Sequence, residues 1–170
     1  STFYQAISFK AFAVDPTDIE MLKKALKYSG KDTSVHKDIF DGDFAFWINH
    51  DKTTAIMKFK EAFEKYPSSK TTCWCLGMSY LWAGQNDSSI KYNQKALDLD
   101  SHFPRAYESL GWNYFVKKDY KETIKNFEIS ISYGADDPNV YRYTGYAYKE
   151  LNNLEKSSFY IQKADSIERK

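Results

Sequence analysis

The sequence predicts an all-α fold built as a stack of antiparallel helix hairpins. The first observation is a 34-residue period: Gly77, Gly111 and Gly145 are equally spaced, and a tyrosine follows each glycine by three residues. The second is that Pro104 and Pro138 share this spacing, and proline is favoured at the first position of a helix. Because this period is typical of helical repeats that pack against their neighbours, we expect a solenoid of about four repeats with a degenerate N-terminal hairpin.

Aligning the glycines divides the chain into the four units 36–69, 70–103, 104–137 and 138–170. The third unit shows the pattern best, because its apolar residues recur at the three- and four-residue spacing of amphipathic helices. They are Tyr107, Leu110, Gly111 and Tyr114 on the first predicted helix, and Tyr120, Ile124, Phe127 and Ile131 on the second. We expect Lys117-Lys118-Asp119 to form the turn between them and Gly134 to end the second helix.

Residues 1–35 fit the same frame loosely, with helices expected at 3–13 and 19–29. The glycine and leucine of the later units are absent there, so the prediction is a degenerate hairpin that caps the stack. The alternative is that 1–14 form a loose arm and that only 17–29 are ordered. At the other end, the predicted helix 154–169 carries polar residues on its outer positions, which is typical of a terminal repeat.

These residues resemble the tetratricopeptide repeat family, whose pattern places an aromatic, leucine-glycine and tyrosine on the first helix, then alanine, phenylalanine and proline on the second. The first unit matches the second-helix half at Ala55, Phe59, Ala62 and Pro67. It departs from the first half, since Asp43 stands at the glycine position and Gly42 one residue early, as a local one-residue slip would produce. In the second unit Asn93 replaces the phenylalanine. The resemblance covers about 36–170 and implies a right-handed superhelix with a concave binding face.

Composition argues against several classes of protein. Lysine and arginine (24) balance aspartate and glutamate (23) for a net charge of +1 without a basic stripe, so we expect no nucleic-acid partner. The chain contains no run of 18 apolar residues, so we expect no membrane insertion. Cys73 and Cys75 would point to different faces of a helix, so a disulfide is not expected, and a reducing compartment such as the cytoplasm is mildly favoured.

Catalytic and metal chemistry are not predicted. His36, His50 and His102 are scattered over turns and unit boundaries, away from cysteine or carboxylate partners at metal-ligand spacing. A glycine-rich loop that would cradle phosphate is also absent. We therefore expect no catalytic residues, no metal and no cofactor, and we do not expect an enzyme.

The candidate binding residues form an aromatic stripe on the predicted first helices. Trp74, Met78 and Trp82 recur every four residues on the side opposite glycine and tyrosine, so the helix 71–83 is apolar all round and is either buried on both sides or exposes a patch. The predicted peptide-binding set is Phe40, Phe44, Trp47, Trp74, Met78, Trp82, Arg105, Trp112, Phe115 and Arg142. Its two arginines suit a carboxylate or an acidic flank. The fourth unit turns polar on this side, with Asn139, Arg142, Tyr146 and Lys149.

Such a stripe favours a non-catalytic protein-interaction module. A large aromatic side chain presents about 150–250 Å², and monomers rarely leave patches above roughly 300–600 Å² uncovered. We expect a hydrophobic or aromatic-anchored peptide or protein segment to lie in the groove. Three alternatives stay open: a self-assembling scaffold that places residues 1–14 in a neighbour's groove and forms a homo-oligomer, the chain's own residues 1–14 filling the groove, and a chaperone for hydrophobic client proteins.

Overall fold

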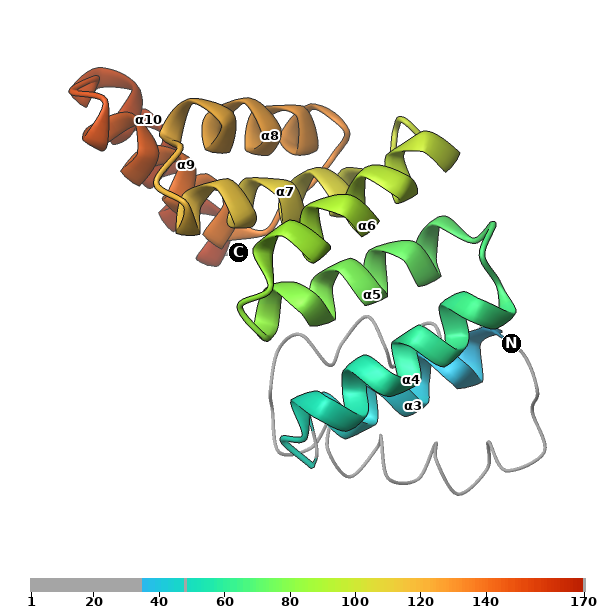
Figure 1. The fold of residues 1–170 in the computed structure, drawn as a ribbon. Coiled ribbons are helices and arrows are strands. Elements are labelled where there is room, and N and C mark those ends of the chain that lie inside the picture. The colour runs from blue at the N-terminus through green and yellow to red at the C-terminus, as the bar shows by residue number, and fades with distance from the viewer. Residues whose placement is uncertain (1–34, 48, 170) are drawn as a thin grey trace.

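The computed structural model describes residues 35–47 and 49–169, and every regular element within them is a helix. The bounds are α3 (Val35–Trp47), α4 (Lys52–Lys65), α5 (Lys70–Trp82), α6 (Asn86–Leu99), α7 (Pro104–Val116), α8 (Tyr120–Ser132), α9 (Pro138–Glu150) and α10 (Leu154–Glu168). Successive helices pair as hairpins that follow one another along the molecule, from α3 and α4 to α9 and α10 (Figure 1). The predicted all-α stack is confirmed, whereas the predicted N-terminal hairpin lies outside the described residues.

The first helices of the hairpins lie next to one another. Each helix packs mainly against its neighbours in sequence, but α3 also contacts α5, and α5 contacts α7. A ring contact between Trp112 and Tyr143 continues this row from α7 to α9. We call the side of the stack to which α3, α5, α7 and α9 contribute the first-helix face, because the predicted binding stripe belongs to these helices.

Close packing within each hairpin explains the repeated glycines. A Cβ atom added to Gly111 would lie 2.4 Å from the ring of Phe127, and one added to Gly42 would lie 2.5 Å from the ring of Phe59. At Gly77 the nearest atom is Asn93 Nδ2 at 2.8 Å, so Asn93 occupies the place that phenylalanine takes in the flanking units. These distances are too short for any side chain, so glycine lets the two helices of a hairpin approach.

The first unit contains the one-residue slip that its sequence suggested. Gly42, and not Asp43, faces the second helix of its hairpin. The linker between α3 and α4 has four residues, whereas the linkers after α5, α7 and α9 have three. The extra residue restores the period, because the left-handed turn position recurs every 34 residues: φ is 54° at His50, 73° at Gly84, 61° at Lys118 and 59° at Asn152.

Polar groups are buried between the second and third hairpins. Asn113 Nδ2 on α7 donates to Ser89 Oγ at 2.8 Å and to the Ser109 carbonyl at 2.7 Å. Asn93 Nδ2 on α6 donates to the Ser89 carbonyl at 2.9 Å. Because buried donors need partners, this network fixes how α6 meets α7.

The outer surface of α10 is less polar than its sequence suggested. Leu154 is 66% exposed and Phe159 60% exposed, whereas the polar residue Ser157 is buried. Ser157 lies where α10 packs closely against α9, since its backbone carbonyl would be 2.9 Å from a Cβ atom added to Gly145.

Candidate functional site

Two members of the predicted stripe lie in the core. Phe40 has no exposed surface, and Trp74 is only 8% exposed. The indole Nε1 of Trp74 donates to Ser109 Oγ at 3.0 Å, so Trp74 bridges α5 and α7. The ring of Phe103 meets the indole edge-on at 6.2 Å. Trp74 therefore joins two hairpins and presents little surface to a ligand.

Met78 and Trp82 lie further along α5 and are half-buried. Met78 Sδ lies 3.4 Å from Ser109 Oγ, whose nearer acceptor is the Arg105 carbonyl at 3.0 Å. The indole of Trp82 stacks on the ring of Phe46, with centroids 3.8 Å apart and planes 23° from parallel. The backbones of Phe44 and Trp47 belong to α3, but their side chains lie outside the described part of the structure.

The stripe continues into an aromatic cluster between α7 and α9. We define the α7–α9 aromatic cluster as Trp112, Phe115, Tyr143 and Tyr146. The ring of Tyr143 lies 4.6 Å from Trp112, 5.0 Å from Phe115 and 5.3 Å from Tyr146, and all three contacts are edge-to-face. Tyr146 is 39% exposed, and Val116 at the end of α7 is 60% exposed. The cluster therefore has a packed inner part and an apolar surface.

Sequence reasoning missed much of this cluster. Tyr143 was absent from the predicted set, and Tyr146 was interpreted as part of a polar face. The 34-residue period already contained the signal, because Tyr146 is the repeat equivalent of Trp112. Val116 was missed because it lies at the last residue of α7.

On α7, Glu108 lies one turn before Trp112 of the cluster, and Arg105 lies two turns before it. The guanidinium of Arg105 lies over the indole of Trp74, 4.9 Å from the ring centroid, and both Arg105 and Glu108 are half-buried. Burial raises the pKa of Glu108 to about 7, with Asp137 and Asp136 adding repulsion while Arg105 and Ser130 favour the charged form. Burial also raises the pKa of Asp43 to about 7, against the opposing effect of Arg105.

Arg142, the other predicted cation of the stripe, is already paired within the chain. Its Nη1 and Nη2 donate to the two carboxylate oxygens of Glu168 at 2.8 and 2.9 Å, and Nη2 also donates to Asp165 at 3.0 Å. These hydrogen bonds raise the pKa of the Arg142 guanidinium above its usual range. Arg142 therefore joins α9 to α10.

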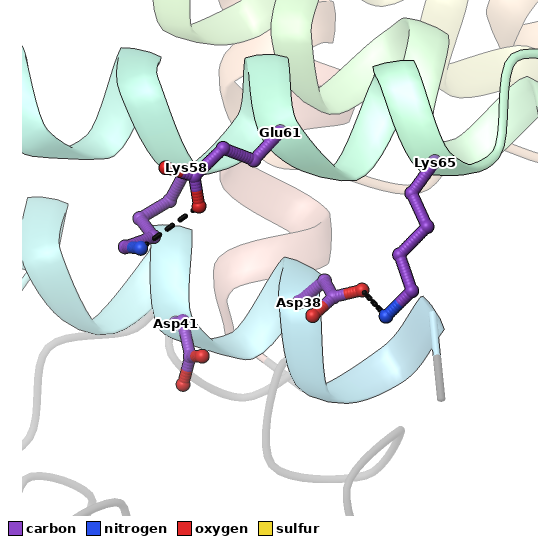
Figure 2. Close-up of a pocket in the computed structure, with 5 residues that line it drawn as sticks. All are labelled: Asp38, Asp41, Lys58, Glu61 and Lys65. Carbon is purple, nitrogen blue, oxygen red and sulfur yellow. Dashed lines mark hydrogen bonds and ion pairs between the residues drawn. The ribbon is translucent and has the colours of Figure 1, made fainter. Parts of the chain in front are cut away.

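A separate polar pocket of about 270 Å³ lies between α3 and α4, lined by Asp38, Asp41, Lys58, Glu61 and Lys65 (Figure 2). Lys65 pairs with Asp38 at 2.9 Å, and Lys58 pairs with Glu61 at 2.8 Å. Asp41 pairs with Lys37 at 2.6 Å. Because its charges are matched and its lining is polar, this pocket does not extend the aromatic stripe.

The cysteines, the potential metal ligands and the hydropathy of the helices were also considered within the described part of the chain. Cys73 and Cys75 are both free and buried, and burial raises the pKa of the Cys75 thiol well above its ordinary value. Among residues 35–47 and 49–169, His, Cys, Asp and Glu form no group of three or more that could hold a metal ion. The described helices also include none that is long and apolar enough to cross a membrane.

Comparison with known sequences points to one family. A sequence profile described as tetratricopeptide repeat matches residues 145–170. The TPR repeat-containing protein YpiA of Bacillus subtilis (strain 168) is 34% identical over 74 residues, which are 44% of this chain and 18% of that protein. The Protein CTR9 homolog of Arabidopsis thaliana is 28% identical over 76 residues, 45% of this chain and 7% of that protein. The chain thus spans less than a fifth of the length of either relative.

Solved structures share the fold across most of the chain. A crystal structure of MamA superposes with a TM-score of 0.69 at 23% identity, covering 89% of this chain and 87% of that one. MamA 41-end from Desulfovibrio magneticus RS-1 gives a TM-score of 0.67 at 15% identity, covering 99% and 94%. Together with the period and the hairpins, the profile match at residues 145–170 and the relative YpiA support the resemblance to the tetratricopeptide repeat family.

Proposed function

We propose that this chain is a non-catalytic protein-interaction module that docks an apolar or aromatic-anchored peptide or protein segment on its first-helix face. The observation that carries the proposal is the α7–α9 aromatic cluster together with Val116. Tyr146 and Val116 expose large parts of their side chains beside three further aromatic rings that are half-buried. Apolar surface gathered in this way commonly marks a binding site.

The burial and the ring contacts of the side chains indicate which of them would anchor the docked segment. Trp112 and Phe115 carry over from the predicted set, and Tyr143, Tyr146 and Val116 extend them on α7 and α9. Rigid aromatic side chains lose little conformational freedom on binding, so they often dominate interface energetics. Met78 and Trp82 continue the surface along α5, and Phe44 and Trp47 remain proposed contacts on α3.

Four members of the predicted set stabilise the fold in this proposal and do not contact the docked segment. Phe40 and Trp74 are buried, so they hold the first helices in place. Arg105 packs over Trp74, and Arg142 is paired with Asp165 and Glu168. The docking energy is therefore assigned to the aromatic and apolar groups nearer the C-terminal ends of α5, α7 and α9.

A phage-displayed library of random peptides, selected against the purified chain, tests the proposal. Peptides that bind should lose affinity by about thirtyfold or more when Trp112 and Tyr146 are both replaced by alanine, because the loss of even one hot-spot aromatic costs about 2 kcal/mol or more. Phe159→Ala is the matched control, since Phe159 is a 60% exposed aromatic residue on α10. Equal binding to the wild type and to a folded Trp112→Ala/Tyr146→Ala variant would refute the proposal.

Self-assembly is the alternative that the aromatic residues Phe3, Tyr4, Phe9 and Phe12 motivate. These residues lie outside the described part of the structure, so the alternative stays a prediction from sequence. Light scattering on the chain with and without residues 1–14 distinguishes it from docking of a foreign segment, because only self-assembly requires the mass to fall on deletion. The chaperone alternative differs from the docking proposal in specificity: a chaperone would select peptides by apolar content alone.

A further inference from the structure

We infer that the segment docked on the α7–α9 aromatic cluster carries a basic side chain, lysine or arginine, that pairs with Glu108. The inference rests on the proposed docking function and adds the chemistry of the partner. It reverses the expectation, drawn from Arg105 and Arg142, that the partner is acidic.

The placement of Glu108 is the first argument. Arg105, Glu108, Trp112 and Phe115 follow one another along α7 at steps of three, four and three residues, which places them on one stripe of the helix. Glu108 therefore lies one turn from Trp112, within reach of a residue that flanks an anchor bound at the cluster. A lysine or arginine stem can lie along the aromatic rings while its charged end meets the carboxylate.

The hydrogen bonds of Glu108 are the second argument. Ser130 Oγ lies 3.3 Å from Glu108 Oε1 and 3.0 Å from the Pro104 carbonyl oxygen. A hydroxyl has one proton, so Ser130 can donate to only one of these acceptors, and the carbonyl is nearer. When Glu108 is ionised, the only hydrogen-bond donor near its carboxylate in the described structure is thus Ser130 Oγ, which the Pro104 carbonyl also attracts. A basic side chain would supply the charged donor that this carboxylate lacks.

The charges nearby are the third argument. Arg105 on α7 packs over Trp74, and Arg142 on α9 is outnumbered by its partners Asp165 and Glu168. Asp136 and Asp137, which precede α9, raise the pKa of Glu108 together with burial, while Arg105 lowers it. Among the described residues, the charged groups that act on Glu108 itself are thus two aspartates and one arginine, and the exposed Lys149 of α9 is not among them, so the complementary partner is basic.

Ionisation gives the interaction a pH dependence. Because burial and the neighbouring aspartates raise the pKa of Glu108 to about 7, the carboxylate is mostly neutral at pH 6 and mostly charged at pH 8. A basic segment pairs with the charged form, so its affinity should be about tenfold lower at pH 6 than at pH 8. Lysine and arginine of the segment stay protonated across this range, so the change in affinity is assigned to the ionisation of Glu108.

The test uses the peptides selected by phage display whose binding depends on Trp112 and Tyr146. We expect lysine or arginine to be enriched in them, and replacing that residue by glutamine should weaken binding to the wild type on the order of tenfold. In Glu108→Gln, which cannot ionise, the same replacement should have no effect, and the pH dependence should disappear. Glu150→Gln, an exposed position at the end of α9, is the matched control and should behave as the wild type.

The experiment distinguishes a failure of this inference from a failure of the proposed docking function. Peptides that depend on Trp112 and Tyr146 but show no basic enrichment, or whose preference for a basic residue survives in Glu108→Gln, would overturn this inference and leave the docking function in place. The absence of any peptide that depends on Trp112 and Tyr146 would remove the docking function and this inference with it.

Discussion

Glu108 is a residue whose charge affects the stability of the folded chain as well as the proposed docking. Burial raises its pKa from an ordinary 4.5 to about 7. Between these values the folded chain holds the proton and the unfolded chain releases it, so this group destabilises the fold progressively as pH rises from 4.5 to 7. The penalty is fully present above pH 7 and absent below pH 4.5.

The substitution Glu108→Gln keeps the shape of the side chain and removes its ionisation. We expect it to raise the free energy of unfolding at pH 8 by about 1–3 kcal/mol and to have little effect at pH 4. Urea unfolding of both proteins over this pH range measures the difference. Since burial also raises the pKa of Asp43 to about 7, subtracting the two curves isolates Glu108. A difference that is the same at pH 4 and pH 8 would contradict the assignment.

At the scale of the helices, each hairpin depends on the contact between its glycine and the residue facing it on the second helix. Gly111→Ala would place a Cβ atom 2.4 Å from the ring of Phe127. The resulting strain exceeds the roughly 1 kcal/mol by which alanine favours a helix, so we expect a net destabilisation of about 1–2 kcal/mol. Thermal unfolding of the variant measures this loss.

A second variant tests whether the loss of stability in Gly111→Ala comes from the contact with the ring of Phe127. Phe127→Leu removes part of the bulk that faces Gly111, so the double variant should be more stable than the sum of the two single changes predicts. Strict additivity would mean that the cost of alanine at this position has another origin.

The helices could be predicted from sequence more completely than the site. Gly77, Gly111 and Gly145 set the period, and Gly42 with its longer linker shows that the first unit follows the same packing after a shift of one residue. Such contacts are local to one hairpin, so the spacing of residues along the chain is enough to predict them.

The split of the aromatic stripe into core and surface could not be predicted in this way. Trp74 and Trp112 both lie on first helices. Ser109 and Arg105 of α7, the first helix of the next hairpin, cover Trp74, whereas Tyr143 and Tyr146 of α9 extend the surface beside Trp112. What decides burial is the residue on the neighbouring repeat. Sequence spacing within one repeat does not contain that information.

At the scale of the whole molecule, the hairpins are joined by few but specific contacts. Stability in such a stack is close to a sum of hairpin terms and nearest-neighbour interfaces. Between the last two hairpins, Glu128 Oε1 on α8 accepts hydrogen bonds from Tyr148 on α9 at 2.6 Å and from Tyr160 on α10 at 2.9 Å. The two tyrosine rings stack with centroids 5.6 Å apart. Glu128 thus ties the last hairpin to the rest of the stack.

Replacing Glu128 by alanine should loosen the last hairpin without affecting the middle of the stack. Two hydrogen bonds to a charged acceptor would be lost, so we expect the free energy of local opening of α9 and α10 to fall by about 1–3 kcal/mol. Hydrogen exchange should therefore accelerate roughly tenfold in α9 and α10 and stay unchanged in α5 and α6. Lys125→Ala is the control, because Lys125 is exposed on α8 and pairs only with Glu122 of the same helix among the described residues. Equal acceleration in all hairpins would show instead that the stack opens as one cooperative unit.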